Sequence, residues 1–155
     1  VGTAISLFSA TGEEIGWRGF LVPALAERFG FRGGSMIGAA IWHAYHLPLI
    51  FFAGYSGQGV QLGYSLACFC AMVFAISPLL TALRLRSGTF WTTALMHASH
   101  NLFIQSIFAS AFNPTATTPW LVGEFGALTA PAGAALAGIY LWRTGVPKTG
   151  ADESQ

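Results

Sequence analysis

Glu13-Glu14-Ile15-Gly16-Trp17-Arg18 is the stretch that decides the fold, because it places three ionisable residues inside apolar sequence. Residues 4–10 before it and 19–26 after it are both typical of a membrane helix. Each ionisable residue costs roughly 2.5–3.5 kcal/mol at the centre of such a helix, so three cost on the order of 9 kcal/mol. We therefore expect these side chains to point into a helix bundle, where ionisable residues are candidates for function.

The composition indicates an integral membrane protein. The chain has 155 residues, of which 54% are hydrophobic and 8% are charged, and its mean hydropathy is +0.58. Soluble domains carry about 25% charged residues. The formal net charge of +1 argues against a nucleic-acid partner, so we expect the lipid bilayer to be the main surroundings.

The apolar runs predict an all-α protein, a polytopic transmembrane helix bundle with about five spans. The predicted spans are residues 3–28, eased or kinked at Pro23, and then residues 34–54, 60–83, 89–112 and 120–142. Residues 1–143 form the predicted core, and residues 144–155 form a polar tail that we expect to be disordered. Because the first apolar run is short, we expect the core to lack upstream helices here.

The basic residues fall on one side of this up-and-down arrangement. They lie in three connections: Arg28, Arg32, Arg84, Arg86, Arg143 and Lys148. The opposite loops, residues 54–59 and 113–119, contain no lysine or arginine. The positive-inside rule then predicts that the basic loops and the C-terminus are cytoplasmic. We expect the membrane to be a bacterial cell membrane.

Helical rise brings polar residues of three spans to one depth. At 1.5 Å per residue, Glu13 lies about 22 Å from Arg28, and His46 lies about 18 Å from Gly34. On the fourth span, His97 lies about 14 Å and Asn101 about 20 Å from Gly88. We therefore predict that Glu13, His46, His97 and Asn101 share one cavity, reached from the cytoplasmic side.

Spacing within the spans predicts which side chains pair. Glu14 and Arg18 are four residues apart and share a helix face, which favours a supporting ion pair. Glu13 is turned about 100° from Glu14 and can face another element. The plainer interpretations are an interhelical hydrogen bond for His43 and for His100, and an interfacial or helix-packing role for Glu124.

Three ordered motifs resemble the CAAX-protease and bacteriocin-processing family of intramembrane proteases. They are Glu13-Glu14-x-x-x-Arg18, Trp42-x-x-x-His46-Leu47-Pro48 and His97-x-x-x-Asn101, with Trp42 standing where that family commonly has phenylalanine. The resemblance implies that Glu13 and His46 activate water and that His97 and Asn101 stabilise the oxyanion. It implies a membrane-embedded protein or peptide substrate, and a supporting role for Glu14 and Arg18.

The chemistry agrees with these roles, because amide hydrolysis needs a base for water and donors for the developing oxyanion. We favour a hydrolase without a cofactor. The alternative is a zinc site, whose ligands would be Glu13, His46 and His97. Against zinc, no two ligands share a helix and no unpaired carboxylate is evident to orient the imidazoles.

Two other classes of protein use intramembrane ionisable residues. A proton- or ion-coupled transporter does so, but such transporters are commonly built from internal repeats, and this sequence shows none. A haem protein would need a histidine pair on two helices, for which His43 and His100 are available.

Overall fold

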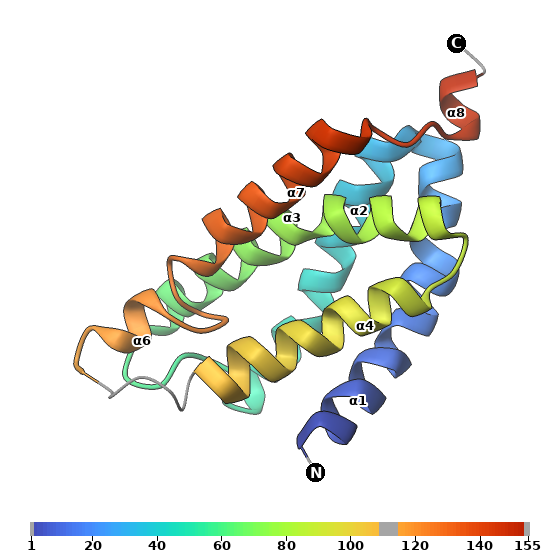
Figure 1. Cartoon of the computed structure of the whole chain (residues 1–155). Coiled ribbons are helices and arrows are strands. Elements are labelled where there is room, and N and C mark those ends of the chain that lie inside the picture. Colours follow the sequence, from blue (N-terminus) through green and yellow to red (C-terminus); the bar gives the residue numbers. More distant parts are fainter. Residues whose placement is uncertain (1, 109–114, 154–155) are drawn as a thin grey trace.

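The computed structural model describes residues 2–108 and 115–153, and these residues form helices and loops without strands (Figure 1). The long helices pair along their lengths. α3 packs against both α2 and α7, and α1 packs against α4. This all-α arrangement confirms the predicted fold class.

The first two predicted spans form a helical hairpin. α1 (Gly2–Gly16) continues through the π-helical segment η1 (Trp17–Leu21) into α2 (Val22–Phe52). Within α2, Gly30 has a φ of 72°, a left-handed conformation that breaks the helix and that glycine adopts at little cost. The break lies between the predicted boundaries at residues 28 and 34, so it separates the two predicted spans.

Small residues hold the two arms of this hairpin close together. A Cβ atom added at Gly34 would lie 2.6 Å from the Cα atom of Ala26, and one added at Gly38 would lie 2.8 Å from Val22 Cγ2. A side chain at Gly34 would force the backbones apart, and one at Gly38 would displace the side chain of Val22. The glycines therefore fix the distance between the arm that carries Glu13 and the arm that carries His46.

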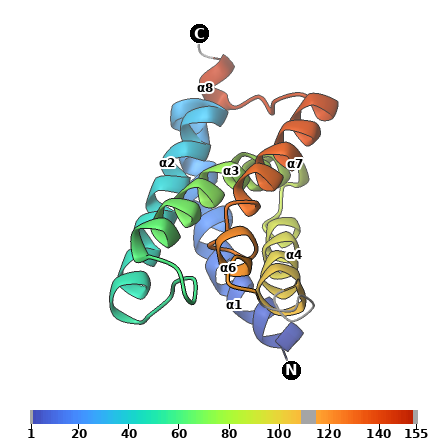
Figure 2. The ribbon, with the colours of Figure 1, turned by 90° about the vertical axis from the view of Figure 1, so that its left-hand side faces the viewer.

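The apolar core lies between α2 and α3 (Leu62–Ser87). Its buried side chains come mainly from these two helices: Ala39, Trp42, Ile50, Phe69, Met72, Val73, Ile76, Leu79, Leu80 and, from α7, Ala137. α3 ends at Gly88, whose φ of 70° gives the left-handed cap typical of helix C-termini. Figure 2 shows α3 crossing between α2 and α7.

The fourth predicted span begins as α4 (Trp91–His100) and widens into a second π-helical segment, η2 (Asn101–Phe108). The predicted end of this span, at residue 112, lies outside the described residues. π-helical turns are uncommon and are often found at functional sites. η2 starts at Asn101, the last residue of the third motif.

The prediction that residues 120–142 form one continuous span is wrong for the outer part of the segment. α6 (Thr118–Leu121) ends early, a loop follows, and α7 (Thr129–Thr144) supplies the remaining helix. Gly123 has a φ of 95°, and a Cβ atom at Gly126 would lie 2.5 Å from the backbone of Leu121. The two glycines allow the chain to turn back tightly, and the apolar composition of the segment did not indicate this turn.

The C-terminal tail differs from the expectation of disorder. Residues Gly150–Glu153 form a short helix, α8, which packs against α2 near the turn at Gly30 (Figure 1). Arg86 Nη2 donates to the carbonyl oxygen of Gly145 at 2.8 Å, and the side chain of Thr149 is buried. The prediction of disorder, which used only the polar composition of the tail, did not include these contacts.

The outside of the molecule is apolar, as a bilayer requires. Phe8, Phe52 and Trp142 are 85%, 89% and 83% exposed, whereas Glu14, Arg18 and His97 are buried. Two helical segments of the described chain, Ser6–Phe52 and Leu62–Ser87, are long and apolar enough to cross a membrane, and the first contains the break at Gly30. The chain is a helical membrane protein, and the count of five spans stays a prediction.

The three basic connections meet at one end of the molecule. Arg32 and Lys148 line one surface pocket, and Arg86 bonds to the carbonyl oxygens of Thr144 and Gly145. This arrangement agrees with the charge asymmetry of the predicted loops. Their cytoplasmic location remains a prediction.

Candidate active site

Pro23 accounts for the π-helical segment η1 that precedes it. In η1 the N–H of Val22 donates to the carbonyl oxygen of Trp17, five residues back. The next donor in that pattern would be the nitrogen of Pro23, which carries no hydrogen. Arg84 Nε instead donates to the carbonyl oxygen of Arg18 at 2.6 Å, so α3 completes the hydrogen bonding of this turn.

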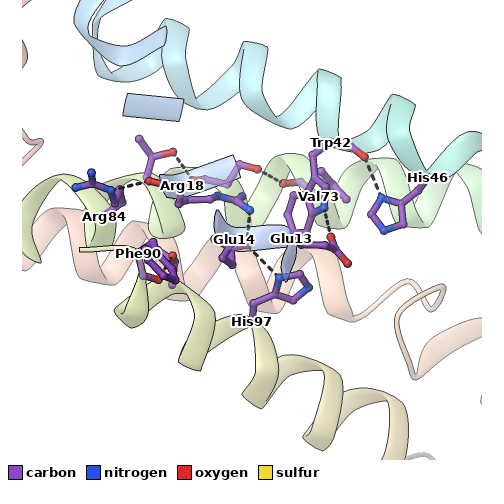
Figure 3. A network of polar contacts seen from close by, with 12 residues as sticks. Glu13, Glu14, Arg18, Trp42, His46, Val73, Arg84, Phe90 and His97 are labelled. Atoms are coloured by element: carbon purple, nitrogen blue, oxygen red, sulfur yellow. Dashed lines mark hydrogen bonds and ion pairs between the residues drawn. The ribbon is translucent and has the colours of Figure 1, made fainter. Parts of the chain in front are cut away.

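Glu14 is the centre of a buried polar cluster (Figure 3). Its Oε1 accepts a hydrogen bond from Arg18 Nη1 at 2.7 Å and another from His97 Nδ1 at 3.0 Å. The side chains of Glu14 and Arg18 are 0% and 2% exposed. The predicted ion pair is therefore present, and it also ties α1 to α4.

Glu13 faces a different element, as its position on the helix predicts. Its Oε2 accepts a hydrogen bond from Trp42 Nε1 on α2 at 3.0 Å. The two neighbouring carboxylates thus have separate tasks, with Glu14 joined to α4 and Glu13 joined to α2 (Figure 3).

The backbone sets the tautomer of His46. Its Nδ1 lies 2.9 Å from the carbonyl oxygen of Trp42, which can only accept, so Nδ1 carries the hydrogen. In a neutral imidazole the other nitrogen, Nε2, then has the lone pair. His46 is consequently arranged to accept a proton at Nε2.

One cavity of about 240 Å³ brings the predicted residues together. Its walls include Glu13 from α1, His46 from α2, His97 from α4 and Asn101 at the start of η2. The convergence predicted from helical depth is confirmed. Their catalytic roles stay a prediction, as does access from the cytoplasm.

Glu14 also orients His97, which the sequence interpretation missed. If Glu14 is the anion that pairs with Arg18, its Oε1 accepts and His97 Nδ1 donates. A neutral His97 would then have only a lone pair at Nε2, whereas the imidazolium has a second N–H there. His97 can donate toward the cavity only as the cation.

Known proteins resemble this chain over its first two thirds. Residues 1–103 match the model of a family described as type II CAAX prenyl endopeptidase Rce1-like. The chain belongs to the Rce1-like family. This is a family of membrane proteases, and all three motifs lie within the matched residues. Membership supports a hydrolase over the transporter interpretation.

One curated relative, from Methanococcus maripaludis, also carries the name of a CAAX prenyl protease. A stretch of 45 residues is 40% identical to CAAX prenyl protease 2 of Methanococcus maripaludis, and it covers 29% of this chain and 17% of that protein. No solved structure matches the chain.

Residues beyond the Rce1-like match complete one wall of the cavity. Tyr55 Oη and Gln105 Nε2 both donate to Glu124 Oε2, the latter at 2.9 Å, and Gln105 Nε2 also lies 3.4 Å from Asn101 Oδ1. Glu124 is thus a packing partner, as one interpretation held, but it faces the cavity from the loop before α7. The sequence signal for this role of Glu124 was an acidic residue within an apolar segment.

The remaining histidines differ in their access to the cavity. His100 is among the lining residues, whereas His43 packs against Phe69 with a ring separation of 5.7 Å. His43 Nδ1 and His100 Nε2 are buried without a hydrogen-bond partner in the described part of the chain. The expected interhelical hydrogen bonds are therefore absent at these two atoms, and His46 is the imidazole of α2 that lines the cavity.

The side chains do not form a ready metal site. Across residues 2–108 and 115–153, no three histidine, cysteine, aspartate or glutamate side chains are grouped to hold one ion. Glu13, His46 and His97 share the cavity without this grouping.

Proposed function

We propose that this chain is the catalytic core of an intramembrane endopeptidase that cleaves CAAX-type or related protein or peptide substrates. The observation that carries the proposal is the single cavity lined by Glu13, His46, His97 and Asn101. Membership of the Rce1-like family supports the reaction class.

In the proposed reaction, Glu13 and His46 activate a water molecule between them. His46 Nε2 has the lone pair, and Glu13 Oε1 remains available because Oε2 accepts from Trp42. One of these groups takes a proton from water as the oxygen bonds to the scissile carbonyl carbon. The same proton then passes to the leaving nitrogen as the C–N bond breaks.

His97 and Asn101 stabilise the negative charge that develops on the carbonyl oxygen. Gln105 donates to Asn101 Oδ1, so the amide nitrogen of Asn101 is the end that can donate to substrate. His97 contributes Nε2–H as an imidazolium whose charge is balanced by Glu14. Donors fixed in place before reaction are effective because they need no reorganisation.

The apolar exterior supports a substrate that is embedded in the membrane. A CAAX sequence carries a lipid on its cysteine, which places the cleavage site next to the membrane. The printed names of the family and of the relative from Methanococcus maripaludis point to this class of substrate.

Of the metal-free and the zinc mechanism, we propose the metal-free one. The absence of a ready three-ligand group supports it. Glu14, however, orients His97 as the carboxylates beside metal-bound imidazoles do, which removes one argument against zinc. Elemental analysis, with phenanthroline treatment and zinc add-back, separates the two: one zinc per active chain and restored activity would overturn the metal-free mechanism.

The proposal is tested with purified protein in detergent or lipid vesicles. Fluorogenic peptides, with and without a farnesylated C-terminal CAAX sequence, should be cleaved by the wild type and not by Glu13→Ala. Glu27→Ala is the matched control, because Glu27 is an exposed acid of the same hairpin. Equal cleavage by the wild type and Glu13→Ala would refute the proposed chemistry.

A further inference from the structure

Trp42 contacts four of the charged or titratable groups of the site. Its indole N–H donates to Glu13, and the Arg18 guanidinium lies 4.4 Å from the centre of its ring. Its ring also meets those of His46 and His97 edge-on, with centroid separations of 6.1 and 5.3 Å. The side chain is only 6% exposed, so packing holds the ring in one orientation.

The indole N–H distinguishes Trp42 from an aromatic residue that only packs against its neighbours. A phenyl ring could pack against the two histidines and below Arg18, but it could not donate to a carboxylate. Among the described residues, the indole is the hydrogen-bond donor to Glu13. It bonds to Oε2, so Oε1 of this cavity-lining residue stays available to a water molecule.

We propose that Trp42 is a positioning residue that fixes the Glu13 carboxylate for water activation through its indole N–H. The inference rests on the proposed function. The carbonyl oxygen of Trp42 holds His46 as well, so one residue sets the geometry of both water-activating groups.

Trp42→Phe tests the inference, because it removes the N–H and keeps both an aromatic ring and the backbone acceptor of His46. We expect kcat to fall about 10- to 100-fold, as the loss of a group that orients a catalytic residue does, while KM changes less than about twofold. Trp17→Phe is the matched control: Trp17 Nε1 is buried without a hydrogen-bond partner among the described residues. A kcat for Trp42→Phe equal to that of Trp17→Phe would overturn the inference.

A double-mutant cycle on Tm keeps the test independent of activity. If the indole acts on Glu13, the losses in Tm from Trp42→Phe and Glu13→Ala should be non-additive, whereas those from Trp17→Phe and Glu13→Ala should add. Additive losses for the first pair would overturn the inference. If the wild type cleaves no peptide, the proposed function fails, and the cycle still decides whether Trp42 holds Glu13.

Discussion

At the scale of single residues, Glu14 Oε1 links the segment η1 to α4. It accepts from the guanidinium of Arg18 and from the imidazole of His97. Its other oxygen, Oε2, is buried without a hydrogen-bond partner among the described residues. The carboxylate therefore depends on these two donors, and removing either one leaves a buried charge poorly compensated.

Arg18→Ala should lower both stability and activity. Breaking a buried ion pair by removing one partner costs roughly 3–5 kcal/mol in soluble proteins. We expect a lower Tm in detergent, together with lower peptide cleavage, because Glu14 would no longer hold His97 in place. Full stability combined with loss of activity would instead place Arg18 in substrate binding.

Asn101→Ala should lower kcat by about 10²–10³, the typical effect of losing one oxyanion donor, and should leave the fold intact. Cleavage assays under saturating substrate measure this, with circular dichroism to check the fold. Ser99→Ala is a suitable control, since Ser99 is exposed on the same helix and bonds only to the carbonyl oxygen of Leu95. A loss below about threefold would remove Asn101 from the catalytic set.

At the scale of helices, the two arms of the hairpin formed by α1 and α2 approach each other so closely that glycines are needed at the contact. Glycine in a helix usually costs about 1 kcal/mol relative to alanine, so Gly→Ala substitutions tend to stabilise. Gly34 is an exception, because a Cβ atom added there would lie 2.6 Å from the Cα atom of Ala26. The spacing of these arms also sets the distance from Trp42 to Glu13.

Gly34→Ala should therefore destabilise the protein and lower its activity, because the arms must separate. Gly12→Ala, on the same hairpin, should be neutral or stabilising, since a Cβ atom there meets nothing within 4 Å. Thermal unfolding and peptide cleavage of both variants check this pair. The same Tm shift in both variants would contradict the packing argument.

Glu124 connects three segments, the loop after α2, the segment η2 and the loop before α7. Glu124→Leu should lower the free energy of unfolding by about 1–3 kcal/mol, because Tyr55 and Gln105 lose their acceptor. Glu124→Gln, which retains an acceptor oxygen, should lose less. Chemical denaturation of the two variants measures the difference, and equal losses would show that the hydrogen bonds contribute little.

At the scale of the whole molecule, the sequence was sufficient to predict that polar residues of three spans face one interior cavity. The cost of burying Glu13, Glu14 and Arg18 predicted an inward face, and helical rise predicted the shared cavity. The reversal at Gly123 and the packing of α8 were missed because both depend on contacts between distant segments. The bond from Glu14 to His97 was missed for the same reason: residues 83 positions apart meet only in the folded chain.

The π-helical turn at η1 absorbs one residue more than an α-helical turn would. Deleting Gly19 would favour ordinary α-helical pairing in this turn, and because the α-helical turn needs one residue fewer, α1 would keep about the same rotation relative to α2. Among homologues, a one-residue gap between Arg18 and Pro23 is therefore compatible with an intact pairing of Glu13 with Trp42.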